Sequence, residues 1–333
     1  AGYQGAEKRP EAQGKVRWLG MPIAELSELD RALVIGSDLR KDHPLFAQRI
    51  RQAVRQGAQV CALAEGAPDW AMPLHAALPS DARDWTQALA AIAVAVAVEK
   101  GVPLPAVAQQ AADTPLAAEQ IEELATVART IAQALLAGSS KAVLLGNAAA
   151  HHPQAASLLA LAQWIAEQTG ARLGYLTEAA NTVGAQYVGA LPQAGGLDVG
   201  QMVQGGLKAA VLLQVEPQWD CAAGEAALQG LQSADTVITL SPFKTNLDIS
   251  DVLLPISPFS ETSGSFINAE GRLQSFHAVV KPLGETRPGW KVLRVLGNHF
   301  GLAGFEYVEA AQVRDELLTA CAQVQANNLI AGE

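Results

Sequence analysis

The sequence predicts an α/β fold with two Rossmann-like, doubly wound and mainly parallel sheets. Three observations indicate this fold: short strands that are apolar throughout, amphipathic helices between them, and a strand–glycine–helix pattern that occurs twice. The chain has 333 residues, of which 50% are hydrophobic and 17% are charged. This composition excludes an intrinsically disordered chain, because a disordered chain combines high charge with low apolar content. The length favours two domains.

The first strand–helix–strand unit follows an irregular, polar segment. Residues 32–35 form a short apolar run that ends at Gly36, which is typical of a buried parallel strand. Pro44 then begins a helix that ends at Gly57, because proline is favoured in the first helical turn and glycine after the last. Residues 59–63 are predicted to form the next strand. Such a β-α-β unit is nearly always right-handed.

The same pattern returns about 110 residues later. Residues 143–145 end at Gly146 and Asn147, a helix that ends near Gly170 follows, and residues 173–176 are the next expected strand. We therefore expect two crossover units on related sheets. The corresponding domain boundaries are, in chain order, an irregular segment at 1–28, a first Rossmann-like lobe at 29–105, and a second lobe with a loop–helix region at 106–333.

Local patterns predict the remaining elements. Residues 93–98 alternate Ala and Val, which is ambiguous between a helix and a strand. Thr114 and Pro115 predict a helix start, and residues 121–135 carry one apolar face. Further strands are expected at 209–215, 236–240 and 252–254, and further helices near 288–297 and 309–324.

Composition disfavours several classes of function. The formal charge of −10 disfavours nucleic-acid binding, which needs a cationic surface. Cys61, Cys221 and Cys321 are isolated from one another, which disfavours a disulfide framework, a zinc site and an iron–sulfur cluster. The sequence shows neither an export signal nor an uninterrupted apolar stretch of membrane-spanning length. We expect a protein of a reducing compartment, with no metal, no nucleic-acid partner and no direct membrane insertion.

The candidate ligand site lies at strand ends, because ligands of open α/β sheets bind at the carboxyl ends of the strands. The turns Gly36-Ser37-Asp38 and Gly146-Asn147 follow two predicted strands, and their glycines let backbone amides approach a ligand. Neither turn has a GxGxxG or GxxxxGK[ST] motif, so plain strand-to-helix turns are the alternative interpretation. Five nearby basic residues are candidates for steering a phosphate or an acidic partner, or for a solvated helix face: Arg40, Lys41, Arg49, Arg51 and Arg55.

The richest polar segment spans residues 257–272. It combines hydroxyl side chains with Glu261, Gly264, Asn268 and Arg272, and we expect it to form a loop at a cleft. The sequence contains no GxSxG or HExxH motif and no Cys–His arrangement typical of nucleophilic catalysis. No catalytic residue is therefore predicted.

Together with the two glycine turns, this segment resembles the molybdopterin oxidoreductase superfamily. The spacing that carries the resemblance is Glu261-x-x-Gly264-x-x-x-Asn268-x-Glu270-Gly271-Arg272. Residues 35–45 and 241–246 are similar to one branch of it, the large iron–sulfur subunits of bacterial NADH:quinone oxidoreductase, respiratory complex I. The resemblance spans roughly residues 16–318.

In that branch, the parent subunit carries [2Fe–2S] and [4Fe–4S] clusters in a region N-terminal to this fold, and the fold itself has lost its cofactor. The resemblance therefore implies a structural module of the peripheral arm of complex I, bound to other peripheral-arm subunits on the cytoplasmic side of the bacterial inner membrane. It implies no cofactor in this chain. The residues of the vestigial pterin-nucleotide cleft would be Gly36, Ser37, Asp38, Gly146, Asn147, Glu261, Gly264, Asn268 and Arg272.

Two other interpretations stay open. In the first, the chain is part of an active molybdopterin-dependent oxidoreductase similar to formate dehydrogenase, and the same loops bind the cofactor. In the second, which rests on architecture alone, it is the middle nucleotide-binding domain of a thiamine-diphosphate enzyme or an electron-transfer flavoprotein. Residues 261–272 have no evident role in that last fold.

Overall fold

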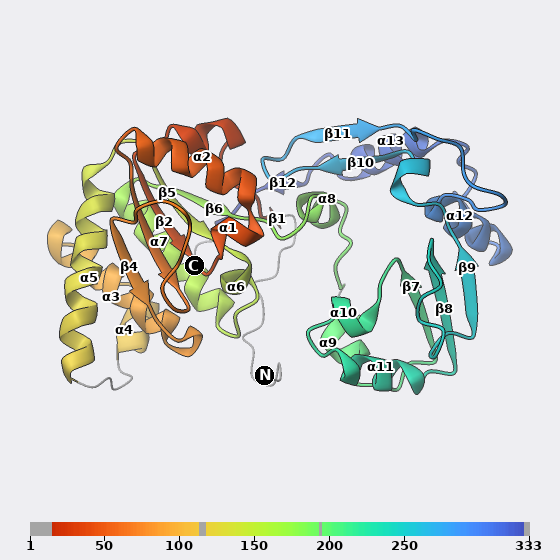
Figure 1. Ribbon diagram of the computed structural model, residues 1–333, viewed down its shortest axis with the longest axis horizontal. Helices are drawn as coiled ribbons and strands as arrows, with labels where there is room; N and C mark the ends of the chain where they lie inside the picture. The colour runs from red at the N-terminus through yellow and green to blue at the C-terminus, as the bar shows by residue number, and fades with distance from the viewer. Residues whose placement is uncertain (1–14, 113–117, 193–194, 330–333) are drawn as a thin grey trace. The chain divides into compact units, whose positions relative to one another are not determined.

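A computed structural model describes residues 15–112, 118–192 and 195–329 of the chain (Figure 1). The described residues form two compact units. Unit 1 lies within residues 1–187, 267–272 and 323–333, and unit 2 comprises residues 188–266 and 273–322. The predicted fold class is confirmed, because both units are α/β structures whose main sheets are parallel.

Unit 1 is built on a five-stranded parallel sheet in the order β4-β3-β2-β5-β6. From β2 the chain adds strands toward one edge, and from β5 it adds a strand toward the other, so the sheet is doubly wound. The switch point lies between β2 and β5, where ligands of such sheets bind. The strands are β2 (Arg31–Ile35), β3 (Gln59–Ala64), β4 (Ala76–Pro79), β5 (Lys141–Leu145) and β6 (Arg172–Tyr175).

Both predicted strand–helix–strand units belong to this single sheet, which corrects the expectation of two related sheets. β2 pairs directly with β5, from Arg31 beside Lys141 to Ile35 beside Leu145. This pairing places β2 and β5 at the centre of the sheet, where each has a hydrogen-bonded partner on both sides. The compact units consequently divide the chain differently from the expected lobes at 29–105 and 106–333, because a boundary after residue 105 would cut through unit 1.

Helices cover both faces of this sheet, as buried parallel strands require (Figure 1). The segment of alternating Ala and Val is helical: it lies in α3, which is too long for a typical strand and ends at Gly101 in a left-handed conformation, φ +66°. Thr114 and Pro115 lie outside the described residues. The helices of unit 1 are η1 (Ile23–Ser27), α1 (Leu39–Asp42), α2 (Pro44–Arg55), η2 (Ala82–Asp84), α3 (Trp85–Lys100), α4 (Ala106–Ala112), α5 (Ala118–Ala137), α6 (Asn147–Ala150), α7 (Ala155–Thr169) and α8 (Thr182–Tyr187).

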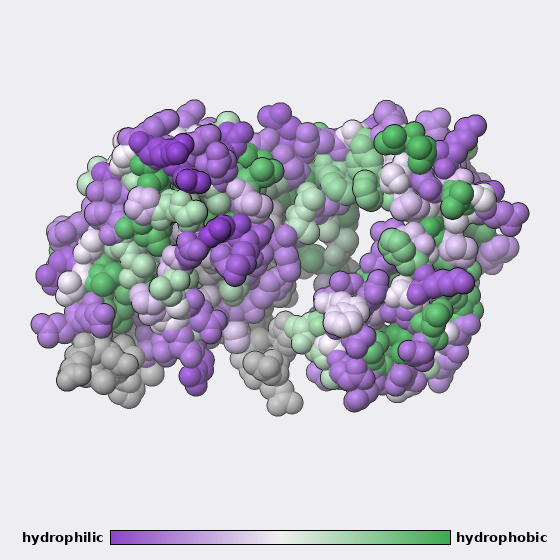
Figure 2. All heavy atoms as spheres, in the orientation of Figure 1, coloured by the Kyte–Doolittle hydropathy of each residue, from purple (hydrophilic) through white to green (hydrophobic). Residues whose placement is uncertain are grey.

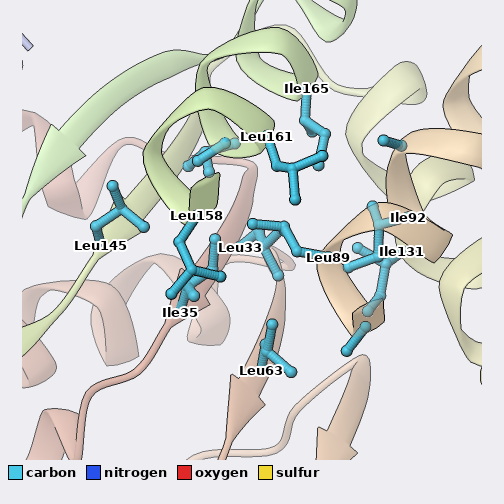
Figure 3. Close-up of a cluster of buried hydrophobic side chains, with 14 of the residues drawn as sticks. Leu33, Ile35, Leu63, Leu89, Ile92, Ile131, Leu145, Leu158, Leu161 and Ile165 are labelled. Carbon is cyan, nitrogen blue, oxygen red and sulfur yellow. The ribbon is translucent and has the colours of Figure 1, made fainter. Parts of the chain in front are cut away.

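Strand alternation divides the core of unit 1 into two clusters. Leu33 and Ile35 of β2 face α3, α5 and α7, and Figure 3 shows them pointing toward Leu89, Ile131 and Leu158. The side chains of the alternate β2 residues belong to the opposite cluster, with α2 and η1. Burial of each large apolar side chain contributes about 1.5–3 kcal/mol, so the two clusters stabilise the sheet from both faces.

Unit 2 contains a smaller parallel sheet in the order β7-β8-β9. Its buried cluster consists of only four residues, which pack between one face of the sheet and α11: Ala210, Leu231, Val237 and Ile249. The elements of this part of the chain are α9 (Val199–Met202), β7 (Ala209–Leu213), α10 (Pro217–Asp220), α11 (Glu225–Gln232), β8 (Thr236–Ser241), β9 (Val252–Pro255), η3 (Phe259–Glu261), β10 (Gly264–Ile267), β11 (Leu273–Phe276), α12 (Gly289–His299) and α13 (Ala310–Ala320).

The polar segment at 257–272 is not only a loop, since it includes η3 and the strand β10. β10 pairs with β11, and the pair is held together by a hydrogen bond of 2.7 Å between the Ser265 and Ser275 hydroxyls. The rings of Phe266 and Phe276 meet edge to face, with centroids 5.3 Å apart.

The two ends of the described chain meet in unit 1. β1 (Lys15–Val16) and β12 (Gln325–Ala326) form a short parallel pair. The buried side chain of Asn328 accepts a hydrogen bond from the Trp18 amide and donates to the carbonyls of Trp18 and Leu173. Among the described residues, no helix has both the length and the apolar character needed to span a membrane.

Candidate functional site

A pocket of about 500 Å³ opens in unit 1 beside the carboxyl ends of β2 and β3. This volume lies within the roughly 300–1,000 Å³ that small-molecule sites occupy. The lining combines two cations, several carboxylates and two indole rings. Its polar and aromatic members are Ser37, Asp38, Arg40, Lys41, Asp42, Glu65, Asp69, Trp70 and Trp85.

Two glycines bring the turns after β2 and β5 into contact at the switch point. A Cβ atom on Gly36, whose φ is +64°, would lie 2.6 Å from the Ala149 nitrogen and 2.7 Å from Trp85 Cζ3. A Cβ atom on Gly146 would lie 2.5 Å from the Gly36 carbonyl oxygen. Both glycines are therefore required by the packing of the protein itself, and the alternative interpretation of plain strand-to-helix turns accounts for them.

The short helix α1 positions the two cations at the pocket. Asp42 holds the start of α1, since its Oδ2 atom accepts hydrogen bonds from the Asp38 amide at 3.0 Å and the Ser37 hydroxyl at 3.5 Å. Arg40 and Lys41 lie in the middle of this helix and line the pocket. The polar side chains of the Gly36 turn thus serve to orient the basic ones.

Each cation has a carboxylate partner. Arg40 Nη1 lies 2.8 Å from Asp69 Oδ2, and Lys41 Nζ lies 3.0 Å from Asp38 Oδ2. Both pairs are largely solvent-exposed, and exposed pairs contribute only about 0–1 kcal/mol to stability. A ligand anion can therefore replace either carboxylate as the partner of a cation at little energetic cost.

The structure places the nine predicted site residues in three locations. Gly36, Ser37 and Asp38 line the pocket, and Gly146 and Asn147 lie beside it at the switch point, where Ala148 N–H donates to the Gly36 carbonyl. The other four do not line this pocket: Asn268, Arg272, Glu261 and Gly264.

Asn268 and Arg272 belong to a turn of unit 1 whose polar side chains form hydrogen bonds and an ion pair within the protein. Asn268 Oδ1 accepts hydrogen bonds from the Glu270 and Arg272 amides, at 3.2 and 2.8 Å. Glu270 forms an ion pair with Arg272 at 3.0 Å and accepts a hydrogen bond from the Ile23 amide at 2.7 Å. This turn attaches residues 267–272 to the N-terminal part of unit 1.

Glu261 and Gly264 have structural contacts in unit 2. Glu261 Oε2 accepts a hydrogen bond from the Leu283 amide at 3.0 Å. A Cβ atom on Gly264 would lie 2.8 Å from Phe276 Cζ, so a larger residue would displace the Phe276 ring. The segment predicted to border one cleft is thus shared between the two units.

The surroundings of Cys61, Cys221 and His152 indicate structural rather than catalytic roles. Burial raises the pKa of the Cys61 thiol to about 12, and burial followed by the Asp220 charge also raises the pKa of Cys221. Both thiols therefore stay protonated near neutral pH. His152 stacks on Trp85, and its Nε2 atom lies 2.8 Å from the Ala82 carbonyl oxygen. Within the described ranges, no three His, Cys, Asp or Glu side chains converge as a metal site.

Four polar or aromatic pocket residues that follow β3 were missed from the sequence: Glu65, Asp69, Trp70 and Trp85. One signal for Glu65 was available, because it lies two residues after the predicted strand at 59–63 and directly after β3, which pairs with β2. The others come from the irregular connection after β3 and from the first residue of α3, so no local pattern marks them.

A second pocket, of about 320 Å³, lies in unit 2. Asn246 lines it with a positive φ of +57°, held by a hydrogen bond of 2.8 Å from its side-chain amide to the Val215 carbonyl. Its polar and aromatic lining comprises Glu216, Gln218, Trp219, Glu225, Gln232, Thr245, Asn246 and Asp248. Cationic side chains do not contribute to this lining, unlike that of the pocket in unit 1.

Comparison with known families identifies the fold. The family model described as "Molybdopterin oxidoreductase" matches residues 4–299. This chain belongs to the molybdopterin oxidoreductase family. A candidate formate dehydrogenase of Staphylococcus aureus (strain bovine RF122 / ET3-1) is 34% identical over 94 residues, which are 28% of this chain and 9% of the relative. The oxidoreductase candidate YjgC of Bacillus subtilis (strain 168) is 39% identical over 69 residues, which are 21% of this chain and 7% of the relative.

Solved structures share the fold at low sequence identity. Acetylene hydratase from Pelobacter acetylenicus aligns with a TM-score of 0.56 and 15% identity, covering 85% of this chain and 50% of its own. A chain of the formyltransferase/hydrolase complex from Methylorubrum extorquens aligns with a TM-score of 0.50 and 17% identity, covering 92% of this chain and 79% of its own. In the two curated relatives named above, the segments that match this chain make up only 9% and 7% of the relative's length.

The family assignment corrects the expectation that this chain holds no cofactor. Membership of the molybdopterin oxidoreductase family and similarity to formate dehydrogenase-like proteins point to binding of a molybdopterin cofactor. The expectation was carried over from one branch of the superfamily. Scarce cysteine argues against iron–sulfur clusters, but a pterin is an organic ligand that needs hydrogen-bonding partners and flat surfaces rather than thiolates.

Proposed function

We propose that this chain is part of a molybdopterin-dependent oxidoreductase similar to formate dehydrogenases, and that the pocket of unit 1 binds a polar part of the cofactor. The observation that carries this proposal is the place of the pocket, at the carboxyl ends of β2 and β3 and next to the switch point of a doubly wound sheet, in a chain of this family. The same pocket contains three of the residues that the sequence named as candidates for a vestigial pterin-nucleotide cleft: Gly36, Ser37 and Asp38.

The donor and acceptor groups of the pocket fit such a ligand. A pterin or nucleotide base presents N–H groups, which carboxylates accept, and Glu65 has no ion-pair partner among the described residues. A phosphate group is anionic and fits Arg40 and Lys41. Trp70 and Trp85 also line the pocket, but both are buried by the protein's own contacts, so they shape its wall and offer a ligand little surface.

In this proposal, the residues of the chain bind and orient rather than react. Arg40 and Lys41 attract the anionic end of the ligand, and the exchangeable pairs with Asp69 and Asp38 keep both cations extended at the pocket before binding. Glu65 selects groups that carry N–H or O–H donors. The bound cofactor supplies a redox-active metal centre, as cofactors supply the chemistry that side chains cannot perform.

The test is the molybdenum, tungsten and pterin content of the full-length parent protein purified from its own cells. Stoichiometric metal and pterin support the proposal, and their absence contradicts it. In the double variant Arg40→Gln/Lys41→Gln, we expect retained pterin to fall about tenfold or more. The control is Arg51→Gln, which removes a neighbouring exposed cation of α2 that does not line the pocket. Equal pterin in both variants would place the cofactor elsewhere.

The motifs at residues 35–45 and 241–246 support a second assignment, which concerns the assembly rather than the cofactor. The second assignment is that the parent protein is a subunit of NADH:quinone oxidoreductase. It is supported if peripheral-arm subunits of that complex co-purify with the parent protein in fixed ratio in the same preparation. Its location would then be the cytoplasmic side of the inner membrane, as part of that complex. Purification with formate dehydrogenase partners instead, or alone, would contradict this second assignment.

A further inference from the structure

We propose that an exposed apolar patch in unit 2 docks a partner protein through a segment that carries apolar side chains flanked by carboxylates. The patch consists of Phe259 in η3 and of Val279, Val280 and Leu283 in the connection between β11 and α12. Their exposed fractions are 82%, 84%, 55% and 79%, respectively. Large side chains exposed together mark an interaction surface more often than isolated ones do. Figure 2 shows further hydrophobic side chains on the surface of unit 2.

Hydrogen bonds bring the patch residues together. The Ser260 carbonyl accepts from the amides of Val279 and Val280, at 2.8 and 3.3 Å. The Glu261 carboxylate accepts from the Leu283 amide at 3.0 Å, and the Ser263 hydroxyl accepts from the Ala278 amide at 3.0 Å. The two segments therefore lie side by side, although they are about twenty residues apart in the sequence.

Further hydrogen bonds join Ser257 to the segment that follows the patch. The Ser257 amide donates to the Arg287 carbonyl at 2.9 Å, and the Ser257 and Thr286 hydroxyls lie 3.3 Å apart. The polar groups of the two segments thus bond to one another, while the large apolar side chains face solvent. Such a surface is preorganised, so binding a partner loses little further backbone entropy.

The charge around the patch identifies the chemistry of the occupant. Lys281 lies between the patch residues, and Arg287 follows them; both are exposed and neither has an ion pair among the described residues. The unit 2 segments around the patch, residues 257–266 and 273–294, contain four Lys or Arg and two carboxylates, Glu261 and Glu285, in a chain whose formal charge is −10. A second copy of this acidic chain, or an anionic membrane, would be repelled by the rest of the molecule, whereas an acidic and apolar segment complements the patch.

The experiment measures the binding of two synthetic amphipathic peptides to the full chain by fluorescence anisotropy. Both peptides carry leucine on one helical face, and the other face carries glutamate in one peptide and lysine in the other. We expect the glutamate peptide to bind at least tenfold more tightly, with a difference that shrinks as salt is added. In the Lys281→Glu variant this preference should be lost or reversed.

The double variant Val279→Ser/Leu283→Ser should bind the glutamate peptide about tenfold more weakly. The matched control is Val98→Ser, because Val98 is 76% exposed but lies in unit 1, apart from the patch. The altered side chains are exposed, so all variants should keep their thermal midpoint. Failure of both peptides to bind, equal binding of the two, or insensitivity to these variants would overturn the proposal. Binding to phosphatidylglycerol vesicles, or dimerisation, that depends on the same residues would also overturn it.

Discussion

The two units differ in where they keep their apolar side chains. In unit 1 both faces of the sheet are covered, by two large buried clusters. In unit 2 the buried cluster beside the sheet has four members, and all but four of the large exposed hydrophobic residues of the described chain belong to this unit. The exceptions are Leu45, Val98, Ile121 and Leu329. The comparison indicates that unit 1 is held by its own core, whereas unit 2 offers apolar surface for contacts outside itself.

The largest expected effect tests this difference directly. Leu33→Ala removes a fully buried side chain from the centre of the unit 1 core and should lower the free energy of unfolding by about 2–5 kcal/mol. Ile249→Ala, in the small cluster of unit 2, should cost less because its surroundings can collapse more easily. Denaturant unfolding followed by tryptophan fluorescence measures both. Equal losses would remove the distinction between the units.

A second prediction concerns the crowded switch point. Gly36→Val should destabilise the protein by at least about 1–3 kcal/mol, because it combines a positive φ with overlap against Ala149 and Trp85. Gly101→Val is the matched control, since Gly101 has nearly the same positive φ (+66°) but its Cβ would meet no atom within 4 Å. The difference between the two thermal midpoints isolates the overlap. If both variants unfold at the same temperature, the cost of the substitution comes from the positive φ alone and not from the overlap with Ala149 and Trp85.

The third prediction concerns the closure of unit 1 by the chain's second end. Asn328→Ala removes three hydrogen bonds and deprives the Trp18 amide of its acceptor, although the Trp18 carbonyl keeps its bond from the Tyr175 amide, so the variant should cost about 1–3 kcal/mol. Hydrogen exchange should accelerate at β1 and β6 while unit 2 is unchanged. Faster hydrogen exchange confined to unit 2 would contradict the assignment of the segment around Asn328 to unit 1.

The smallest expected effect is a dependence of stability on pH. Burial lowers the pKa of His43 below 6.5, although the nearby Asp42 charge opposes the shift, and His43 Nε2 is buried with no hydrogen-bond partner among the residues that the structure describes. The unfolded chain therefore binds this proton more readily, so stability should decline as the pH falls through 6.5 and level off below the folded pKa. His43→Gln should flatten the slope of unfolding free energy between pH 7.5 and 5.5. An unchanged slope would assign the proton to another group.

The sequence by itself determined the local elements and the fold class. The apolar run before Gly36, the proline at the start of α2 and the left-handed Gly170 after α7 depend on neighbours along the chain, so they can be recognised from periodicity and residue type. It also indicated the strand ends at which the pocket lies, through Gly36, Ser37 and Asp38.

Only the tertiary structure decided which strands share a sheet and which polar residues meet. Pairing of β2 with β5 depends on contacts between residues about 110 positions apart, and no local pattern specifies it. For the same reason, no sequence pattern predicted that Asp69 and Trp70 line the pocket. Asn268 and Glu261, which were predicted to line a cleft, instead accept hydrogen bonds from backbone amides of the protein. Periodicity reports the environment of a residue, buried or exposed, but the identity of its neighbours is set by long-range packing.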